Sequence, residues 1–292
     1  MFFLFAKNLN KNAMRFACQN TFIGVFVIFW QLILIFIPIF LFSIFKPSHY
    51  IYTFFISFFF ILFNGTRMRA LGNIIHECCH YNFVPSKKAN RQIGTLLSTL
   101  ELSCFASYQK EHFSHHKYLG DILFDEDFKV RHQIGICNEK SFCLKGFIFI
   151  VLSPKNWFII LKSSIHLNFK NKIINLIRLN YVIIFFILCY FFTFKLMLLF
   201  VILPFITTYQ MMKILSDFLD HGGLYFNEKR EHKTRNHYFS FAILNWIFFP
   251  RNDCFHLTHH LYPAIPTTQL HEKHKILLKE KENYGTRRHC IF

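Results

Sequence analysis

The sequence is poor in acidic residues, glycine and proline. Its 292 residues include 16 Asp and Glu against 33 Lys and Arg, with 10 Gly and 8 Pro. This composition excludes collagen-like chains and low-complexity disordered chains. Charged residues make up 17% of the chain, compared with about 25% in soluble proteins. Hydrophobic residues reach 53%, with 42 Phe, and an integral membrane protein explains such a composition best.

Paired cysteines and nucleotide-binding motifs are also lacking. None of the nine Cys belongs to a C-x-x-C pair, and no G-x-G-x-x-G stretch is present. A zinc ribbon, a thioredoxin-like site and a dinucleotide site are therefore disfavoured. We interpret the cysteines as small buried hydrophobic residues in a reducing compartment.

The formal net charge is +17. A basic excess of this size arises from nucleic-acid binding, from attraction to an anionic membrane or from membrane topology. Most of the Lys and Arg residues flank apolar runs, which favours topology. We expect no nucleic-acid partner.

Four apolar runs are long enough to cross a bilayer, which takes about 20 residues. Residues 16–45 and 47–66 carry no Asp, Glu, Lys or Arg and are separated by Lys46, and a second pair is separated by Lys195. The first run is too long for a signal peptide, and no small-residue cleavage site follows it. The pattern predicts two helical hairpins. The expected spans are about 21–45, 48–68, 177–194 and 196–218.

The distribution of positive charge predicts the orientation of these spans. Residues 67–172 hold 15 Lys and Arg and residues 229–288 hold 11, whereas each outer turn holds one. By the positive-inside rule, both termini and the long segments of about 69–176 and 222–292 should be cytoplasmic. Shorter apolar stretches at 92–109, 146–161 and 241–249 are expected to be interfacial helices. The predicted fold is an all-α integral membrane protein, a single domain over residues 1–292, with a cytoplasmic helical cap.

Seventeen His residues are present, and eight of them form three clusters with helical spacing. The clusters are His76 and His80; His112, His115 and His116; and His256, His259 and His260. Positions i, i+3 and i+4 share one face of a helix. Crowded imidazoles repel one another if they are protonated, and a bound metal removes that cost by using neutral imidazole. Eight nitrogens suit two metals, but imidazole alone does not choose among Fe, Cu, Zn and Ni.

Two other classes of metal-binding membrane protein could explain part of this pattern. The first cluster also fits H-E-x-x-H, in which His76 and His80 would bind zinc and Glu77 would be the general base of an intramembrane metalloprotease. One zinc site leaves both later clusters unexplained. A non-enzymatic metal transporter would need polar residues within the spans, and these are nearly absent.

The three clusters in this order, on a chain with four spans, resemble the histidine boxes of the membrane fatty acid desaturase superfamily. The third box continues as Leu261-Tyr262-Pro263-Ala264-Ile265-Pro266, and the second is followed by Gly120-Asp121 and Asp125-Glu126-Asp127. Both continuations are familiar in that family. The resemblance covers about residues 20–275. It implies four membrane helices under a cytoplasmic cap that holds two irons.

Carried over residue by residue, the resemblance implies nine iron ligands. They are His76, His80, His112, His115, His116, His221, His256, His259 and His260. His221 is included because family members use a His near the end of the fourth span. Asp217 lies one helical turn earlier, where some members place an Asn that reaches iron through water. Further carboxylates expected to orient ligands are Asp121, Asp125, Asp127, Glu77 and Asp253.

The resemblance also implies an oxidoreductase that uses O2 and two electrons at a di-iron centre, with no catalytic side chain beyond the metal ligands. The chain has no His-Pro-Gly-Gly stretch of a fused cytochrome b5 domain. Electrons are therefore expected from a separate protein such as ferredoxin or cytochrome b5. The expected substrate is an acyl chain or another lipid-like molecule, and the expected reaction is desaturation. Hydroxylation or ketolation of a carotenoid, a sphingolipid or a small amino-acid-derived compound stays an alternative.

Overall fold

The computed structural model describes residues 18–45, 49–167, 169–227, 229–285 and 287. The predicted outer turn at Lys46 and both chain termini lie outside the described residues. The helices are α1 (Thr21–Phe45), α2 (Tyr50–Cys79), α3 (Lys87–Leu100), α4 (Phe105–Tyr118), α5 (Glu126–Gln133), α6 (Leu144–Gly146), η1 (Phe147–Val151), α7 (Pro154–Ser164), α8 (Lys172–Phe192), α9 (Phe194–Met197), η2 (Leu198–Ile202), α10 (Leu203–Ile206), α11 (Thr208–His221), η3 (Arg230–Lys233), α12 (Ala242–Phe248), η4 (Pro250–Asn252), α13 (His256–Leu261), η5 (Thr267–Gln269), α14 (Leu270–Glu280) and α15 (Glu282–Gly285).

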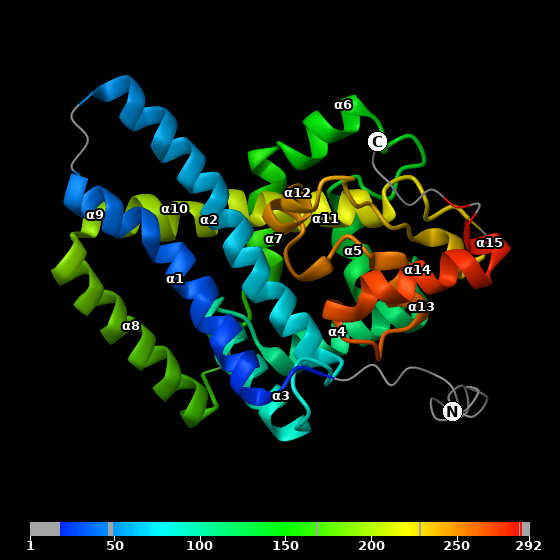
Figure 1. The fold of residues 1–292 in the computed structure, drawn as a ribbon, viewed down its shortest axis with the longest axis horizontal. Helices are drawn as coiled ribbons and strands as arrows, with labels where there is room; N and C mark the ends of the chain where they lie inside the picture. Colours follow the sequence, from blue (N-terminus) through cyan, green and yellow to red (C-terminus); the bar gives the residue numbers. More distant parts are fainter. Residues whose placement is uncertain (1–17, 46–48, 168, 228, 286, 288–292) are drawn as a thin grey trace.

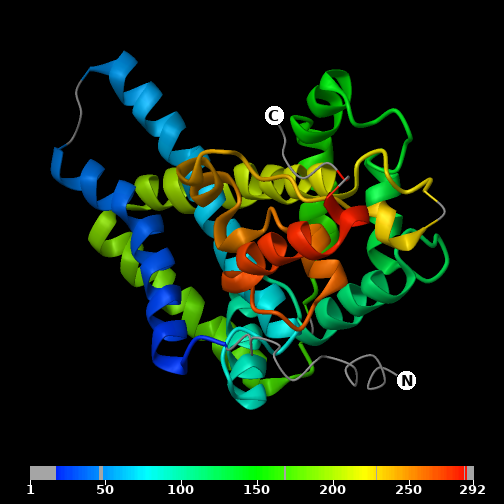
Figure 2. The same cartoon turned by 45° about the vertical axis from the view of Figure 1, so that its right-hand side comes forward.

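Four helical stretches are long and apolar enough to cross a membrane: Thr21–Phe45, Tyr50–Cys79, Lys172–Phe192 and Phe194–His221. The prediction of four apolar helices is therefore confirmed, whereas the orientation of the chain in the membrane stays a prediction. Side chains such as Phe22, Phe54 and Phe186 are largely exposed. Such a surface suits contact with lipid. In the two views, α1, α2 and α8 lie on one side, and α4, α5, α13 and α14 lie on the other (Figures 1 and 2).

The second span extends well beyond the apolar run that predicted it. At 1.5 Å per residue the 30 residues of α2 are about 45 Å long, more than the hydrocarbon core of about 30 Å. The last turns of α2, which carry His76, therefore extend beyond an apolar layer of this thickness.

The fourth span is not one regular helix. It contains a π-helical turn, η2, and a break at Thr207, where φ is −119° and ψ is −87°. A π-helical turn frees backbone carbonyls, and the amide of Asn64 in α2 donates to the Phe200 carbonyl at 2.6 Å and to the Ile35 carbonyl at 3.0 Å. This one buried side chain therefore links α1, α2 and η2.

Close contact between α2 and α11 depends on Gly65. A Cβ atom at this position would lie 2.7 Å from the backbone carbonyl carbon of Thr208 and against its hydroxyl. The Thr208 hydroxyl itself donates to the Ile61 carbonyl at 2.8 Å. Because α11 ends at His221, this close approach also fixes where His221 lies.

Polar side chains on α2 hold the segment that precedes the third histidine box. Arg67 is buried, donates to the carbonyls of Trp246 and Ile247 at 2.7 and 2.8 Å, and lies over the Trp246 ring. Three further pairs connect the same two segments: Arg69 with Asp253, Asn73 with the Pro250 carbonyl, and Glu77 with Arg251. Arg67 and Arg69 therefore help to anchor residues 246–253 to α2.

The stretch expected to be one interfacial helix at 92–109 is two helices. α3 ends at Leu100, and α4 begins at Phe105. Leu102 between them has a positive φ of 59°. The carboxylate of Glu101 accepts a hydrogen bond from the Tyr209 hydroxyl at 2.7 Å. This turn directs α4, with its histidines, away from α3.

Candidate metal centre

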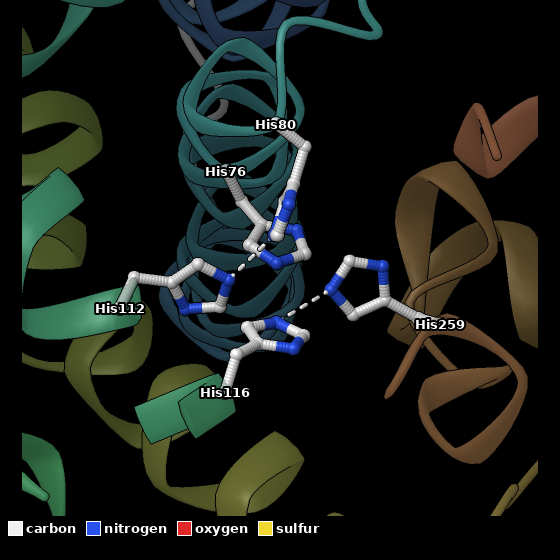
Figure 3. Close-up of side chains that lie close together, drawn as sticks. All are labelled: His76, His80, His112, His116 and His259. Carbon is white, nitrogen blue, oxygen red and sulfur yellow. Dashed lines mark hydrogen bonds between the residues drawn. The ribbon is translucent and has the colours of Figure 1, made fainter. Parts of the chain in front are cut away.

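The nine histidines named from the sequence gather in two groups. The first group is His76, His80, His112, His116 and His259, and the second is His115, His221, His256 and His260. Within each group, one ring nitrogen per residue lies within 4.8 Å of all the others. Figure 3 shows the five rings of the first group converging from the C-terminal end of α2, where His80 directly follows the helix, and from α4 and α13.

Helical spacing explains how the boxes divide between the groups. On α4, His112 and His116 are one turn apart and join the first group, while His115 joins the second. On α13, His259 joins the first group, and His256 and His260 join the second. Each of these two helices therefore serves both groups, which explains why the groups are adjacent.

Distances between ring nitrogens fit metal binding. The Nε2 atoms of His80 and His112 are 2.8 Å apart, and those of His116 and His259 are 3.1 Å apart. In the second group, Nε2 of His256 lies 3.0 Å from His221 and 2.9 Å from His260. Two nitrogens bound to one ion at about 2.0–2.1 Å are separated by about 3 Å when they are neighbouring ligands. Both groups therefore offer ligand sets of suitable size for a transition metal.

Burial favours the neutral form of five histidines of the two groups that lie outside the spans. Burial, reinforced by neighbouring imidazoles, lowers the pKa of His112, His116, His256 and His260 well below its usual value. Burial also lowers the pKa of His259 to about 4. Neutral imidazole is the form that binds metals. Folding alone therefore prepares these nitrogens as ligands at neutral pH.

Side chains and backbone atoms that contact the outer ring nitrogens orient the histidines of the second group. Asp125 Oδ2 lies 3.0 Å from Nδ1 of His115 and accepts from the Gly120 amide at 2.9 Å. The same carboxylate is the N-cap of α5 and accepts from the Phe128 amide. Burial opposes ionisation, but the hydrogen bond with His115 and the charge of Arg131 prevail and lower the pKa of Asp125 to about 2. Its charge is therefore available to hold His115 with Nε2 facing the group.

His221 and His256 are also oriented by contacts at their Nδ1 atoms. Nδ1 of His221 donates to the Lys233 carbonyl at 2.8 Å. Nδ1 of His256 lies 3.5 Å from Asp220, whose other carboxylate oxygen is 2.7 Å from Nε2 of His237. A hydrogen bond at one ring nitrogen directs the other toward the metal. Sequence reasoning missed Asp220 and His237, because no spacing rule connects them with the boxes.

Arg131 was also missed. It is buried, its Nη1 lies 2.8 Å from Nδ1 of His115, and its Nη2 is 2.9 Å from Asp217 and 3.5 Å from Asp127. Asp127 was expected to orient a ligand, and Asp217 to occupy the position from which some family members reach iron through water. Both contact the guanidinium of Arg131, which in turn contacts His115.

The remaining expected carboxylates have structural partners. Asp253 pairs with Arg69 and accepts from Ser216, while Asp121 accepts from backbone amides of its own loop. Within the described part of the chain, Asp125 is the one residue of the six expected carboxylates that is hydrogen-bonded to a histidine of either group. Glu77 is buried and pairs with Arg251 at 2.5 Å. A carboxylate engaged in this way is poorly suited to be the general base of a zinc protease.

A cavity of about 430 Å³ reaches both groups. His76 and His112 of the first group and His256 of the second line its wall. Its volume falls within the range of about 300–1,000 Å³ that small-molecule sites occupy. A substrate in this cavity would lie beside the proposed metal ligands.

Four candidate membrane spans, two adjacent histidine groups and an attached cavity define a membrane protein equipped to bind metal and to act on a molecule beside it. A family model described as "Fatty acid desaturase" matches residues 53–292. The chain belongs to this family, and the resemblance seen in the sequence is confirmed.

Curated relatives match over a short part of the chain. A "Delta(12) fatty acid desaturase" of Mortierella isabellina is 34% identical over 70 residues, and one of Mortierella alpina is 35% identical over 65 residues. These matches cover 23% and 22% of this chain, and 18% and 16% of the relatives. The substrate of this chain is therefore a matter for proposal.

Proposed function

We propose that the chain is a membrane-bound oxidoreductase that uses O2 and two electrons at a di-iron centre to desaturate an acyl chain or another lipid-like substrate. The observation that carries this proposal is the division of nine histidines into adjacent groups of five and four. One four-coordinate zinc would leave about half of these ligands unused. Family membership supports iron as the metal.

In this proposal, His76, His80, His112, His116 and His259 hold one iron, and His115, His221, His256 and His260 hold the other. Bound iron would supply the oxidising power that breaking an unactivated C–H bond needs, which side-chain acids and bases lack. The protein keeps the imidazoles neutral by burial, and it fixes their orientation through Asp125, Asp220 and the Lys233 carbonyl.

Membrane location supports a lipid-like substrate, and the proposed orientation places the histidine groups and both termini on the cytoplasmic side. We also propose a separate electron donor of the ferredoxin or cytochrome b5 type. The chain carries 33 Lys and Arg against 16 Asp and Glu, and a basic surface favours docking of an acidic partner. Turnover that is insensitive both to salt and to Lys→Glu changes at exposed positions would contradict this docking.

The experiment that tests the function uses protein in lipid nanodiscs, supplied with O2, a reduced carrier and a mixture of acyl lipids. Mass spectrometry should detect products that have lost two hydrogen atoms. Products that have gained an oxygen atom would favour the hydroxylase alternative. His115→Ala should abolish the reaction, whereas His132→Ala, which changes an exposed histidine of α5, should not. Peptide cleavage without lipid oxidation would overturn the proposal.

A further inference from the structure

The segment of residues 233–237 connects the two helices that carry most of the second histidine group, although none of its residues is a proposed ligand. On one side, the Lys233 carbonyl accepts from Nδ1 of His221 at 2.8 Å, at the end of α11. On the other side, the His237 amide donates to the Cys254 carbonyl at 2.9 Å, shortly before α13 begins. The segment is therefore bonded to both of these parts of the chain.

The side chain of His237 is joined to the second group through one carboxylate. Its Nε2 lies 2.7 Å from Oδ1 of Asp220, and Oδ2 of the same carboxylate lies 3.5 Å from Nδ1 of His256. The side chains of His237 and Asp220 are each 2% exposed, so water competes little for these contacts. Nε2 of His256 faces His221 and His260. A chain of contacts thus leads from His237 through Asp220 to the proposed ligands.

The surroundings of His237 also indicate which of its ring nitrogens carries the proton. Its Nδ1 atom is buried and has no hydrogen-bond partner among the described residues. A buried N–H group without an acceptor is costly, so the proton belongs on Nε2, where the carboxylate of Asp220 accepts it. His237 is therefore a fixed donor to Oδ1, and it leaves Oδ2 of Asp220 for His256.

Asp220 needs a positive charge that nearby side chains do not supply. Among the described residues, no Lys or Arg nitrogen lies within 4.0 Å of its carboxylate, which has His237 and His256 as its ion-pair partners. A buried carboxylate without a counter-charge is costly. A metal ion bound to His256 would supply that charge through the imidazole ring. One carboxylate thus links the orientation of His256 to the charge of the metal.

The first histidine group has no such support at the ring that it takes from α13. Nδ1 of His259 is buried and has no hydrogen-bond partner in the part of the chain that the structure describes. The first group also has five imidazoles, compared with four in the second, so one misplaced ring removes a larger share of the second set. A change at His237 should therefore act on the second group and leave the first intact.

We propose that His237 is a positioning residue of the second metal site. It holds the carboxylate of Asp220 in the orientation in which Oδ2 meets Nδ1 of His256, and it thereby keeps Nε2 of His256 directed at the metal. The inference rests on the proposed function, because it assigns His237 to one of the two proposed irons. The affinity for this iron then depends on a residue outside the ligand set.

The test compares His237→Gln with His237→Met. The two new side chains have similar volumes, but Gln offers an N–H donor near the position of Nε2, whereas Met offers none. Wild type, both variants and the control His232→Ala would be loaded with Fe²⁺ in detergent and titrated with a ferrous chelator. His232 is an exposed histidine of the neighbouring turn η3, so His232→Ala should behave like the wild type.

His237→Met should release about half of its iron at a chelator concentration about tenfold below that needed for the wild type. Loss of an outer contact to a ligating histidine costs about 10- to 100-fold in metal affinity, and His237 acts one contact further out. His237→Gln should restore most of the affinity. Because His237 acts through Asp220, adding His237→Met to Asp220→Asn should cause little further loss of affinity. In a His115→Ala background, which already lacks the second site, His237→Met should have no effect on the remaining iron.

Equal iron affinity in His237→Met and the wild type would overturn the inference, and so would equal losses in His237→Met and His237→Gln. Iron loss from both groups together, additive effects with Asp220→Asn, or failure of His237→Met to fold would show a general structural role and overturn it as well. The wild type tests the proposed function separately. One zinc, or fewer than two irons, contradicts the di-iron proposal, whereas two irons that do not respond to His237→Met contradict this inference alone.

Discussion

The carboxylate of Glu77 accepts hydrogen bonds from Nε and Nη2 of Arg251, at 2.5 and 2.7 Å, across 174 residues of sequence. Glu77 is next to the first ligand of the first box, and Arg251 precedes the third box by a few residues. Arg251 also has a positive φ of 66°, a conformation that a side chain other than Gly adopts at a cost. The ion pair therefore stabilises the turn that precedes α13 and positions His256 and His259.

Glu77→Gln should destabilise the protein by about 3–5 kcal/mol, because it leaves a buried guanidinium without its counter-charge. Metal content should fall in both groups, since the third box contributes to each. Thermal unfolding and metal analysis measure these effects, with Glu272→Gln as the control. A zinc protease predicts the reverse pattern, in which Glu77→Gln keeps the metal and loses hydrolysis.

Asp125→Asn should weaken metal binding by the second group and leave metal binding by the first group unchanged. Loss of a carboxylate behind a metal-bound histidine lowers metal affinity by about 10- to 100-fold. A chelator titration should then remove about half of the metal from Asp125→Asn at concentrations that leave the wild type loaded. Asp121→Asn is the matched control, because Asp121 lies in the same loop and, among the described residues, its carboxylate accepts only from the Leu123 and Phe124 amides. Equal metal loss from both groups would contradict the assignment of Asp125 to His115.

Gly65→Ala should push α11 away from α2, because the new Cβ meets the backbone of Thr208. Overpacking of this kind costs about 1–3 kcal/mol. His221 should lose its place in the second group, so the variant should bind less metal. Gly285→Ala is the control, since within the described part of the chain its Cβ would meet only the Leu278 carbonyl oxygen at 3.8 Å. Full metal content in Gly65→Ala would show that the contact does not position His221.

Acid should destabilise the metal-free protein below pH 6.5. Burial lowers the pKa of His259 from its usual value of 6.5 to about 4, so the unfolded chain takes up protons in this interval that the folded chain does not. Stability then rises with pH between 4 and 6.5 and falls as the solution is acidified. Thermal unfolding of metal-free wild type and His259→Ala should show a steeper pH dependence in the wild type. Equal slopes would contradict the buried neutral state of His259.

The helices and the clustering of the histidines could be predicted from the sequence because local spacing encodes both. An apolar run of fixed length predicts a span, and i, i+3, i+4 spacing predicts that His112, His115 and His116 share a helix face. His221 was predicted from the family resemblance, because it matches by position a His that family members use near the end of the fourth span. What spacing did not predict is how α4 and α13 divide their histidines between two groups, since that depends on where the helices pack.

The residues that contact the histidines were harder to predict, because they come from distant segments of the sequence. Arg131 lies on α5, and its contacts with His115 and Asp217 depend on how α4, α5 and α11 meet. The π-helical turn and the break at Thr207 also escaped prediction, because an apolar run does not reveal irregular backbone within it.

Metal content per chain tests the central claim most directly. Detergent-purified wild type, His112→Ala, His115→Ala and His132→Ala would be loaded with iron and measured by elemental analysis. The di-iron proposal predicts about two irons in the wild type and in His132→Ala, and clear losses in both His112→Ala and His115→Ala, which belong to different groups. A single zinc that is retained in His115→Ala would contradict it.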